Sequence, residues 1–363
     1  MIIKNINAAG LFGGASLNFV LLTLINTDGI DVHEIRKSTA VPYPESLACD
    51  IRAIIGKRLL NYADLEADEN VQQLKENMCD FYAETLSQFL RNEAADVVGI
   101  DGLTIGYDAE NKCSYQLENG QKLSDISGYK IVTHFHKADL LSGGQAAPLS
   151  PPLINAIGQK INKPVLFIDI ETVCSLIYLG ESGEITAFDC APGRAMIEDW
   201  TFKRANMQTD YNGKYAALGK IHTQIVDALL KHKFLRKNPP KSLDIMTFSE
   251  KREHLEGLSL EDGTATATAF IAEAVYQAAL DFLPKIPHDI YVIGSGLRNP
   301  TLMRMLKQNF APRELKFLPN GEVYGAISTA FNAARRVYSL PITFPTTTGA
   351  YEPMSGGEIY EKK

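Results

Sequence analysis

Ile185-Thr-Ala-Phe-Asp-Cys-Ala-Pro-Gly193 is an apolar, strand-like run that leads into a carboxylate and then a Pro-Gly turn. A strand would fix Asp189 in place, and the turn would leave room in front of its side chain. That setting suits a general base. Asp189 could instead cap a helix that starts near Pro192, because aspartate oxygens accept hydrogen bonds from the first amides of a helix. The segment by itself favours the cap.

The composition limits the classes of protein that remain. A chain of 363 residues is too long for one ordinary core and predicts two domains. Apolar residues make up 45% and charged residues 22%, as in a soluble globular protein. The net charge of −7 argues against a general nucleic-acid or anionic-membrane binder. The five cysteines form no C-x-x-C pair, which indicates reduced thiols in the cytoplasm.

The uncharged stretch 8–25 superficially resembles a signal peptide, but Gly10, Gly13 and Gly14 interrupt it. It is interpreted as a strand, a Gly-rich turn and a second strand. No later stretch has the roughly 18 to 20 unbroken apolar residues of a membrane span. We therefore expect a cytoplasmic protein with no membrane and no nucleic-acid partner.

Strands and helices alternate in both halves, which predicts an α/β fold. Residues 1–163 are expected to form an N-terminal α/β domain and 164–338 a C-terminal, nucleotide-binding α/β domain. The tail 339–363 should pack back on the first domain. Strands are expected at 17–25, 97–100, 114–117, 130–135, 165–170, 173–179, 185–188, 290–293 and 315–318. Helices are expected at 45–58, 66–92, 194–202, 214–232, 264–283, 300–307 and 325–338.

Three Gly-containing turns could bring backbone amides close to an anion, although such turns are as often only turns. They lie at 10–16, 142–148 and 291–300. The last follows an apolar strand and resembles a nucleotide-binding corner. His134 and His136 form an H-x-H pair that is expected on one face of a strand end. No third ligand follows at a useful spacing, so no metal site is predicted.

Six strings occur along the chain in one order. They are Asp139-x-x-x-Gly-Gly-Gln-x-Ala-Pro-Leu149, Phe188-Asp-x-x-Pro-Gly193, Asp210-x-x-Gly-x-x-Ala-x-x-Gly219, Pro239-Pro-Lys-Ser242, Gly294-x-Gly-x-x-Asn-Pro-x-Leu-Met303 and Pro345-x-x-Thr-Gly-Ala350. No single string is decisive, but six in register are specific. The chain resembles the anhydro-N-acetylmuramic acid kinases over essentially its whole length.

The resemblance implies a two-domain actin/hexokinase-like (ribonuclease H-like) fold with a central nucleotide cleft. It implies a homodimer that uses Mg-ATP and water to convert 1,6-anhydro-N-acetylmuramic acid into N-acetylmuramic acid 6-phosphate. It also reverses the preference at Asp189, which matches the family's general base. The implied site residues fall into four further groups. They are a phosphate loop (Gly13, Gly14, Ala15, Ser16, Asn18), a second phosphate loop (Asp169, Glu171, Thr172), an adenosine side (Gly294, Ser295, Gly296, Asn299) and a sugar side (His136, Asp139, Gly144, Gln145, Pro192, Gly193).

The chain also departs from the family pattern. Ala15 and Asn18 replace a threonine and an aspartate in the first phosphate loop, and Glu171 and Thr172 replace two glycines in the second. His136 replaces an arginine on the sugar side. Two further functions therefore stay open beside the kinase. One is a catalytically impaired pseudokinase or regulatory binding protein on the same fold, and the other is a kinase for a changed sugar.

Overall fold

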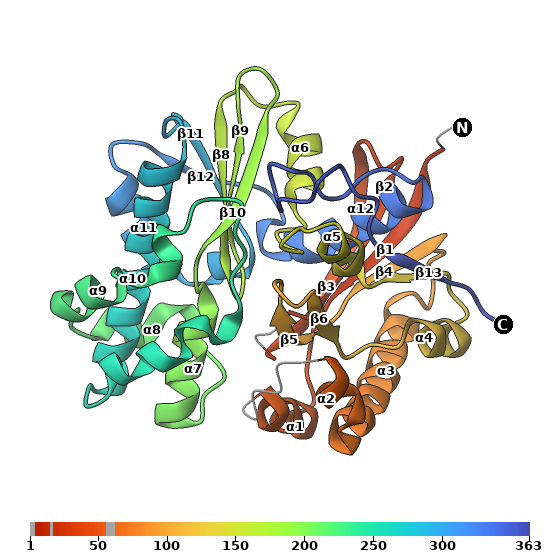
Figure 1. The fold of residues 1–363 in the computed structure, drawn as a ribbon, viewed down its shortest axis with the longest axis horizontal. Helices are drawn as coiled ribbons and strands as arrows, with labels where there is room; N and C mark the ends of the chain where they lie inside the picture. The colour runs from red at the N-terminus through yellow and green to blue at the C-terminus, as the bar shows by residue number, and fades with distance from the viewer. Residues whose placement is uncertain (1–3, 15–16, 56–61) are drawn as a thin grey trace. The chain divides into compact units, whose positions relative to one another are not determined.

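Two compact units make up the protein. The computed structural model describes residues 4–14, 17–55 and 62–363. Unit 1 comprises Met1–Ile157 and Gly325–Lys363, and unit 2 comprises Gly158–Tyr324 (Figure 1). The sequence instead placed its divisions after residues 163 and 338. The two divisions differ at residues 158–163 and at one helix, α12 (Tyr324–Val337), which belongs almost entirely to unit 1.

Unit 1 is built on a six-stranded sheet with the order β13-β7-β4-β1-β2-β3. Strands β1, β2 and β3 form an antiparallel meander, while β4 and β7 run parallel to β1. A separate two-stranded sheet pairs β5 with β6. The bounds are β1 (Ile6–Phe12), β2 (Phe19–Thr27), β3 (Val32–Pro42), α1 (Glu45–Ile55), α2 (Tyr62–Ala67), α3 (Glu69–Phe89), β4 (Val97–Asp101), β5 (Thr104–Asp108), β6 (Cys113–Gln116), α4 (Gly120–Ser127), β7 (Ile131–Thr133), α5 (Phe135–Leu141), α6 (Pro151–Gly158) and β13 (Glu358–Tyr360).

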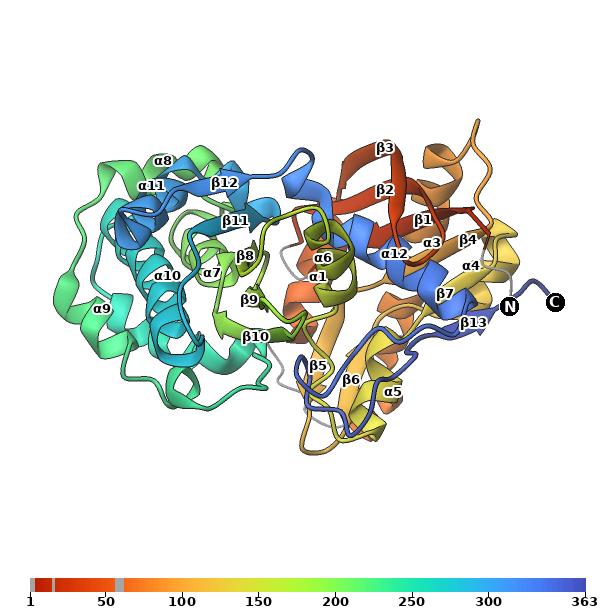
Figure 2. The same cartoon turned by 90° about the horizontal axis from the view of Figure 1, so that it is seen from above.

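Small residues explain why α12 packs on this sheet. Side chains alternate between the two faces of a strand, so Leu11 joins the core cluster with α1 and α3 while Gly10 faces the other way. A Cβ on Gly10 would lie 2.1 Å from the carbonyl oxygen of Ala326 in α12. A Cβ on Gly99 of β4 would lie 2.5 Å from the carbonyl oxygen of Thr329. Figure 2 shows α12 lying over these strands.

Unit 2 has a five-stranded sheet with the order β10-β9-β8-β11-β12. Strands β8, β9 and β10 are antiparallel neighbours, and β11 and β12 run parallel to β8. The helix α10 contacts α7, α8, α9 and α11 as well as β10, which gives this unit its own core. The bounds are β8 (Val165–Ile170), β9 (Cys174–Leu179), β10 (Ile185–Ala191), α7 (Arg194–Ala205), η1 (Tyr211–Gly213), α8 (Lys214–Leu218), α9 (Thr223–Leu229), η2 (Lys233–Arg236), η3 (Ile245–Leu255), α10 (Leu260–Phe282), β11 (Asp289–Ile293), η4 (Ser295–Arg298), α11 (Pro300–Phe310), β12 (Leu315–Phe317) and η5 (Gly321–Val323).

The two sheets share the order of five strands, to which unit 1 adds the antiparallel edge strand β13. In each, an antiparallel meander of three strands is followed by two strands that run parallel to the first. A repeated core of this kind is the expected α/β, ribonuclease H-like architecture, and the predicted fold class is confirmed.

Two predicted elements are wrong in detail. The strand expected at 130–135 ends at Thr133, and α5 starts at Phe135 after His134 adopts a left-handed conformation with φ 57°. The helix expected at 214–232 is two helices, because α8 ends at Leu218 and α9 begins only at Thr223. In the part of the chain that the structure describes, no helix is long and apolar enough to cross a membrane.

Candidate active site

Asp189 lies inside β10, immediately before a β-bulge in the pairing with β9. Its side chain is only 4% exposed and accepts three hydrogen bonds. The Ser175 hydroxyl donates to Oδ1 at 2.7 Å, and the Ser242 hydroxyl and the Leu243 amide both donate to Oδ2 at 2.9 Å. A carboxylate has about four acceptor positions, so most of its hydrogen-bonding capacity is already used.

Two opposing effects act on the Asp189 carboxyl. Burial raises its pKa, because the charged form loses solvation, and the three donors oppose that rise by stabilising the anion. The rise prevails, which moves the pKa of Asp189 in the direction that a general base near neutral pH requires.

The helix-cap interpretation of Asp189 is wrong. The residue at the N-cap of α7 is Gly193, and no side chain caps that helix. The amides of Arg194 and Ala195 donate to the carbonyl oxygens of Glu171 and Thr172, at 3.0 and 3.1 Å. Gly193 has φ 57°, and a Cβ there would lie 2.6 Å from the Glu171 oxygen. The Pro192-Gly193 turn therefore fits α7 tightly against the loop between β8 and β9.

Glu171 follows β8 in the chain, and its side chain binds the backbone corner that follows β11. Its Oε1 accepts the Ser295 amide at 3.0 Å, and its Oε2 accepts the Ser295 hydroxyl. Burial raises the pKa of Glu171, while Arg194, Ser295 and Arg298 counteract part of the rise. A residue of the predicted second phosphate loop is thus bonded to a residue of the predicted adenosine side within one unit.

The other residues of this corner pack closely on their own unit. A Cβ on Gly294, where φ is 92°, would lie 2.4 Å from the Ile170 carbonyl oxygen, and Gly296 packs against the Ile170 side chain. Asn299 caps α11, and its Oδ1 accepts the Leu302 amide at 3.0 Å. In the second phosphate loop, Asp169 is paired in register with Ser175 and Ile293, and Thr172 is buried.

The first Gly-rich loop belongs to unit 1. The Gly13 amide donates to the Asp101 carbonyl at 2.9 Å, and the Tyr43 hydroxyl donates to the Gly13 carbonyl at 2.5 Å. Asn18 is buried, and Gly14 is half-buried. Ala15 and Ser16 lie outside the described residues.

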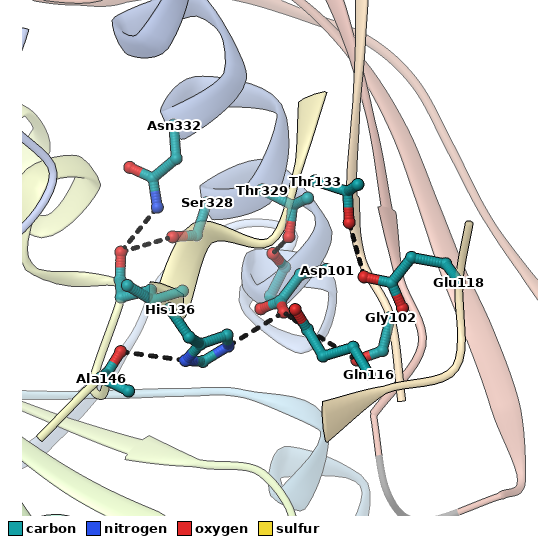
Figure 3. A network of polar contacts seen from close by, with 12 residues as sticks. Asp101, Gly102, Gln116, Glu118, Thr133, His136, Ala146, Ser328, Thr329 and Asn332 are labelled. Atoms are coloured by element: carbon teal, nitrogen blue, oxygen red, sulfur yellow. Dashed lines mark hydrogen bonds and ion pairs between the residues drawn. The ribbon is translucent and has the colours of Figure 1, made fainter. Parts of the chain in front are cut away.

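His136 is part of a buried polar network in unit 1 (Figure 3). One ring nitrogen, Nδ1, faces the Ala146 carbonyl oxygen at 3.0 Å, and Nε2 faces Asp101 Oδ1 at 3.3 Å. Gln116 Nε2 donates to the same Asp101 oxygen at 2.9 Å. Burial lowers the pKa of His136, but Asp101, Ala146 and Glu118 outweigh it and the pKa is raised. His134 makes none of these hydrogen bonds; its ring instead faces Tyr360 edge-on, with 6.2 Å between the ring centres.

Glu118 is the most constrained carboxyl of the network. It is 0% exposed, and Thr133 donates to its Oε1 at 2.5 Å. Among the described residues, its Oε2 has no hydrogen-bond partner. Burial raises the pKa of Glu118 to about 7, with Asp101 adding to the rise and His136 opposing it. The side chains of Glu118, Asp101 and His136 therefore interact electrostatically within one buried network.

The Gly-Gly-Gln loop is tied to the C-terminal segment of unit 1. Asp139 is fully buried, and its oxygens accept the Ala146 amide at 2.7 Å and the Thr348 hydroxyl at 2.5 Å. The Gln145 amide donates to the Thr348 carbonyl at 2.8 Å. A Cβ on Gly144 would lie 2.0 Å from Asp139 Oδ2, so this glycine allows the carboxylate to reach the loop.

The sequence did not identify four of the residues that complete these groups: Ser175, Ser242, Asp101 and Glu118. Ser242 stands in a string that carried the resemblance, but its chemistry was not assigned. Ser175 could have been found by counting from the turn at Gly180–Gly183, because that hairpin pairs Asp189 with Ser175. Among the described residues, no group of three or more His, Cys, Asp or Glu could hold a metal ion by itself.

Comparisons with known proteins agree on one family. The profile described as anhydro-N-acetylmuramic acid kinase matches residues 7–362. A protein of that name from Zymomonas mobilis is 33% identical, covering 97% of this chain and 99% of the relative. One from Rhodospirillum rubrum is 34% identical, covering 97% and 94%.

Solved structures match at lower similarity. A ROK family glucokinase from Streptomyces griseus, in complex with glucose and AMPPNP, has a TM-score of 0.42 at 11% identity, covering 91% of this chain and 99% of that chain. Component A of (R)-2-hydroxyglutaryl-CoA dehydratase from Acidaminococcus fermentans has a TM-score of 0.45 at 15% identity, covering 92% and 99%.

The repeated strand order and the buried strand carboxylate define an actin/hexokinase-like protein of the sugar-kinase kind. Within that class, the chain belongs to the anhydro-N-acetylmuramic acid kinase family. The alternative of a catalytically impaired or regulatory protein has no support from these comparisons.

Proposed function

We propose that the protein is an ATP-dependent kinase that acts on 1,6-anhydro-N-acetylmuramic acid and releases N-acetylmuramic acid 6-phosphate. The family match over residues 7–362 carries this proposal. The setting of Asp189 supports it, because a buried carboxyl with a raised pKa suits proton abstraction near neutral pH.

In this reaction a water molecule attacks the anomeric carbon, and Asp189 takes the proton that the water loses. The bond between the anomeric carbon and O6 breaks, and O6 accepts the γ-phosphoryl group of ATP. Ser175 and Leu243 hold the carboxylate so that it cannot rotate away from the water. Phosphoryl transfer otherwise depends on positioning and on neutralising the charge of the phosphates.

Magnesium fits this site only together with the nucleotide. Mg²⁺ is commonly held by one or two carboxylates plus substrate phosphates rather than by a protein cage. That requirement agrees with the lack of a three-ligand cluster among the described residues. We assign Asp169, near the end of β8, as the carboxylate that would hold it. When bound, the ion supplies positive charge to the phosphates.

The remaining roles are part of the same proposal. His136, Asp139, Gly144 and Gln145 are assigned to the sugar, with Pro192 and Gly193. The corner at Gly294, Ser295, Gly296 and Asn299 is assigned to the adenosine. The cytoplasmic location and the homodimer, which the sequence suggested, also stay predictions.

Addition of Mg-ATP is expected to stabilise the protein against thermal unfolding. A ligand at 100 times its Kd adds roughly 2.7 kcal/mol to the free energy of unfolding. Differential scanning fluorimetry with and without millimolar Mg-ATP checks this, followed by an assay of sugar phosphate and ADP from the anhydro-sugar. If Mg-ATP neither raises the melting temperature nor yields product, the protein is not this kinase.

Glu171→Gln is expected to tighten Mg-ATP binding about tenfold. The substitution removes a negative charge from the second phosphate loop, and unit charges a few ångströms apart interact by one to several kcal/mol. Isothermal titration calorimetry compares the variant with the wild type. Glu184→Gln, in the exposed turn between β9 and β10, removes the same charge and should leave the Kd unchanged. Equal affinities for Glu171→Gln and the wild type would show that Glu171 does not lie near the bound phosphates.

A further inference from the structure

The Asp189 side chain is almost completely buried. It is 4% exposed, and three donors surround its two oxygens. Of the two hydroxyls among these donors, Ser175 is also buried, at 7% exposed. Ser242 is only half-buried. The Ser242 hydroxyl is therefore the more accessible of the two side chains bonded to this carboxylate.

Ser242 is held in place by its neighbour in the chain. The Asp189 amide donates to the Lys241 carbonyl at 3.0 Å, which ties the segment 241–243 to β10. Together with the hydrogen bonds from Ser242 and Leu243, this bond makes three contacts between the segment and Asp189. The position of the Ser242 hydroxyl against Asp189 Oδ2 thus follows from backbone contacts as well as its own bond.

The Lys241 side chain anchors the same segment from behind. It is 0% exposed, and its Nζ donates to the carbonyl oxygens of Phe234 and Leu235, both at 3.2 Å. The nitrogen also lies 4.2 Å from the centre of the Phe282 ring and 5.7 Å from that of Phe188. Ammonium groups are attracted to aromatic faces at these distances. A buried cation with this many partners fixes the loop firmly.

We propose that Ser242 is a proton relay between the attacking water and Asp189, a role that rests on the proposed function. As the water oxygen bonds to the anomeric carbon, its proton passes to Ser242 Oγ. The original Ser242 hydroxyl proton passes to Asp189 Oδ2 in the same step. Ser242 ends as a neutral hydroxyl and Asp189 as a carboxylic acid. The reverse path returns the proton to solvent after the products leave.

A hydroxyl is suited to this role because it donates one proton and accepts through its lone pairs at the same time. The Ser242 hydroxyl donates to Asp189 across the 2.9 Å contact, and its lone pairs can accept a hydrogen bond from a water molecule. Ser175 makes a shorter contact, but its burial keeps it a positioning residue that orients the carboxylate.

Ser242→Ala is expected to lower the single-turnover rate about 10²-fold, within the range of general acid–base effects, while KM for the sugar changes less than threefold. Ser242→Thr keeps a hydroxyl and should recover most of the rate. Ser182→Ala removes a hydroxyl from the exposed β9–β10 turn and should match the wild type. Thermal melts of all three variants verify that the fold is kept.

A proton inventory in mixed H₂O and D₂O separates a relay from a positioning role. A relay moves two protons in one step, so the single-turnover rate of the wild type should curve with the deuterium fraction, and that of Ser242→Ala should be linear. A linear wild-type plot, or a Ser242→Ala rate within threefold of the wild type, would overturn the relay. Turnover that survives Asp189→Asn would instead refute the base itself, which keeps the two failures distinct.

Discussion

Asp189→Asn is expected to lower kcat by about 10³-fold, because an amide cannot take the proton from the attacking water. Nucleotide affinity and the melting temperature should change little. The amide can be accommodated with its nitrogen donating to Ser175 Oγ, whose hydroxyl then turns away. Its oxygen keeps the bonds from the Ser242 hydroxyl and the Leu243 amide. The loss would then belong to the chemistry and not to the fold.

The measurement is a steady-state assay of ADP release with the anhydro-sugar, beside calorimetry with Mg-ATP. Asp289→Asn is a matched control, because it changes a carboxylate of the same unit that pairs with Lys316 at 2.6 Å near the start of β11. That variant should keep kcat. A kcat for Asp189→Asn within tenfold of the wild type would show that Asp189 is not the general base.

Much of the fold was predictable because it follows local patterns. The strands of unit 2 are short apolar runs between turns, and the hairpin at Gly180–Gly183 sets the register of β9 and β10. By contrast, β3 was missed. It is an edge strand with mostly half-buried or exposed polar residues, so it lacks the apolar run that marked the other strands.

The placement of α12 could not be deduced from periodicity. The periodicity of its sequence predicts a helix but not the unit on which that helix packs. The packing depends on contacts with Gly10 and Gly99, which are more than 200 residues away in the chain. The helix start at Phe135 was missed for a similar reason. An apolar run through 130–135 predicts a strand, and the break depends on a left-handed backbone at His134.

The hydrogen-bond partners of Asp189 also differ in whether the sequence could predict them. Ser175 is fixed by hairpin register, which the sequence contains, while Ser242 is 53 residues further on and reaches Asp189 only through tertiary packing. The sequence could place a carboxylate at the end of a strand. It could not indicate that three donors would surround it.

The stability of the protein is expected to fall by about 3 kcal/mol between pH 4.5 and 8, with Glu118 as the cause. Its pKa is about 7 in the folded protein, against 4.5 for an ordinary glutamate. Between these values the unfolded chain has released a proton that the folded chain still holds. The free energy of unfolding therefore decreases as pH rises through this window, by 1.36 kcal/mol for each unit of pKa difference, and becomes level above it.

Glu118→Gln should remove this dependence, because the amide has no charge to bury. Asp101 from β4, Thr133 from β7 and His136 from α5 face the group, and Tyr43, Cys79 and Tyr82 also interact with it electrostatically. The raised pKa of His136 adds a further decrease above about pH 6.5 that the variant should largely retain. Urea unfolding from pH 5 to pH 8 should show the variant gaining about 2.5 kcal/mol on the wild type.

The matched control is Glu84→Gln, which neutralises an exposed glutamate on α3 and should leave the pH profile of the wild type unchanged. Parallel profiles for Glu118→Gln and the wild type would mean that Glu118 stays ionised throughout. That result would require a donor for Oε2, since an unpaired, fully buried carboxylate oxygen is costly. The shape of the profile therefore reports directly whether a proton resides at the centre of the unit 1 network near neutral pH.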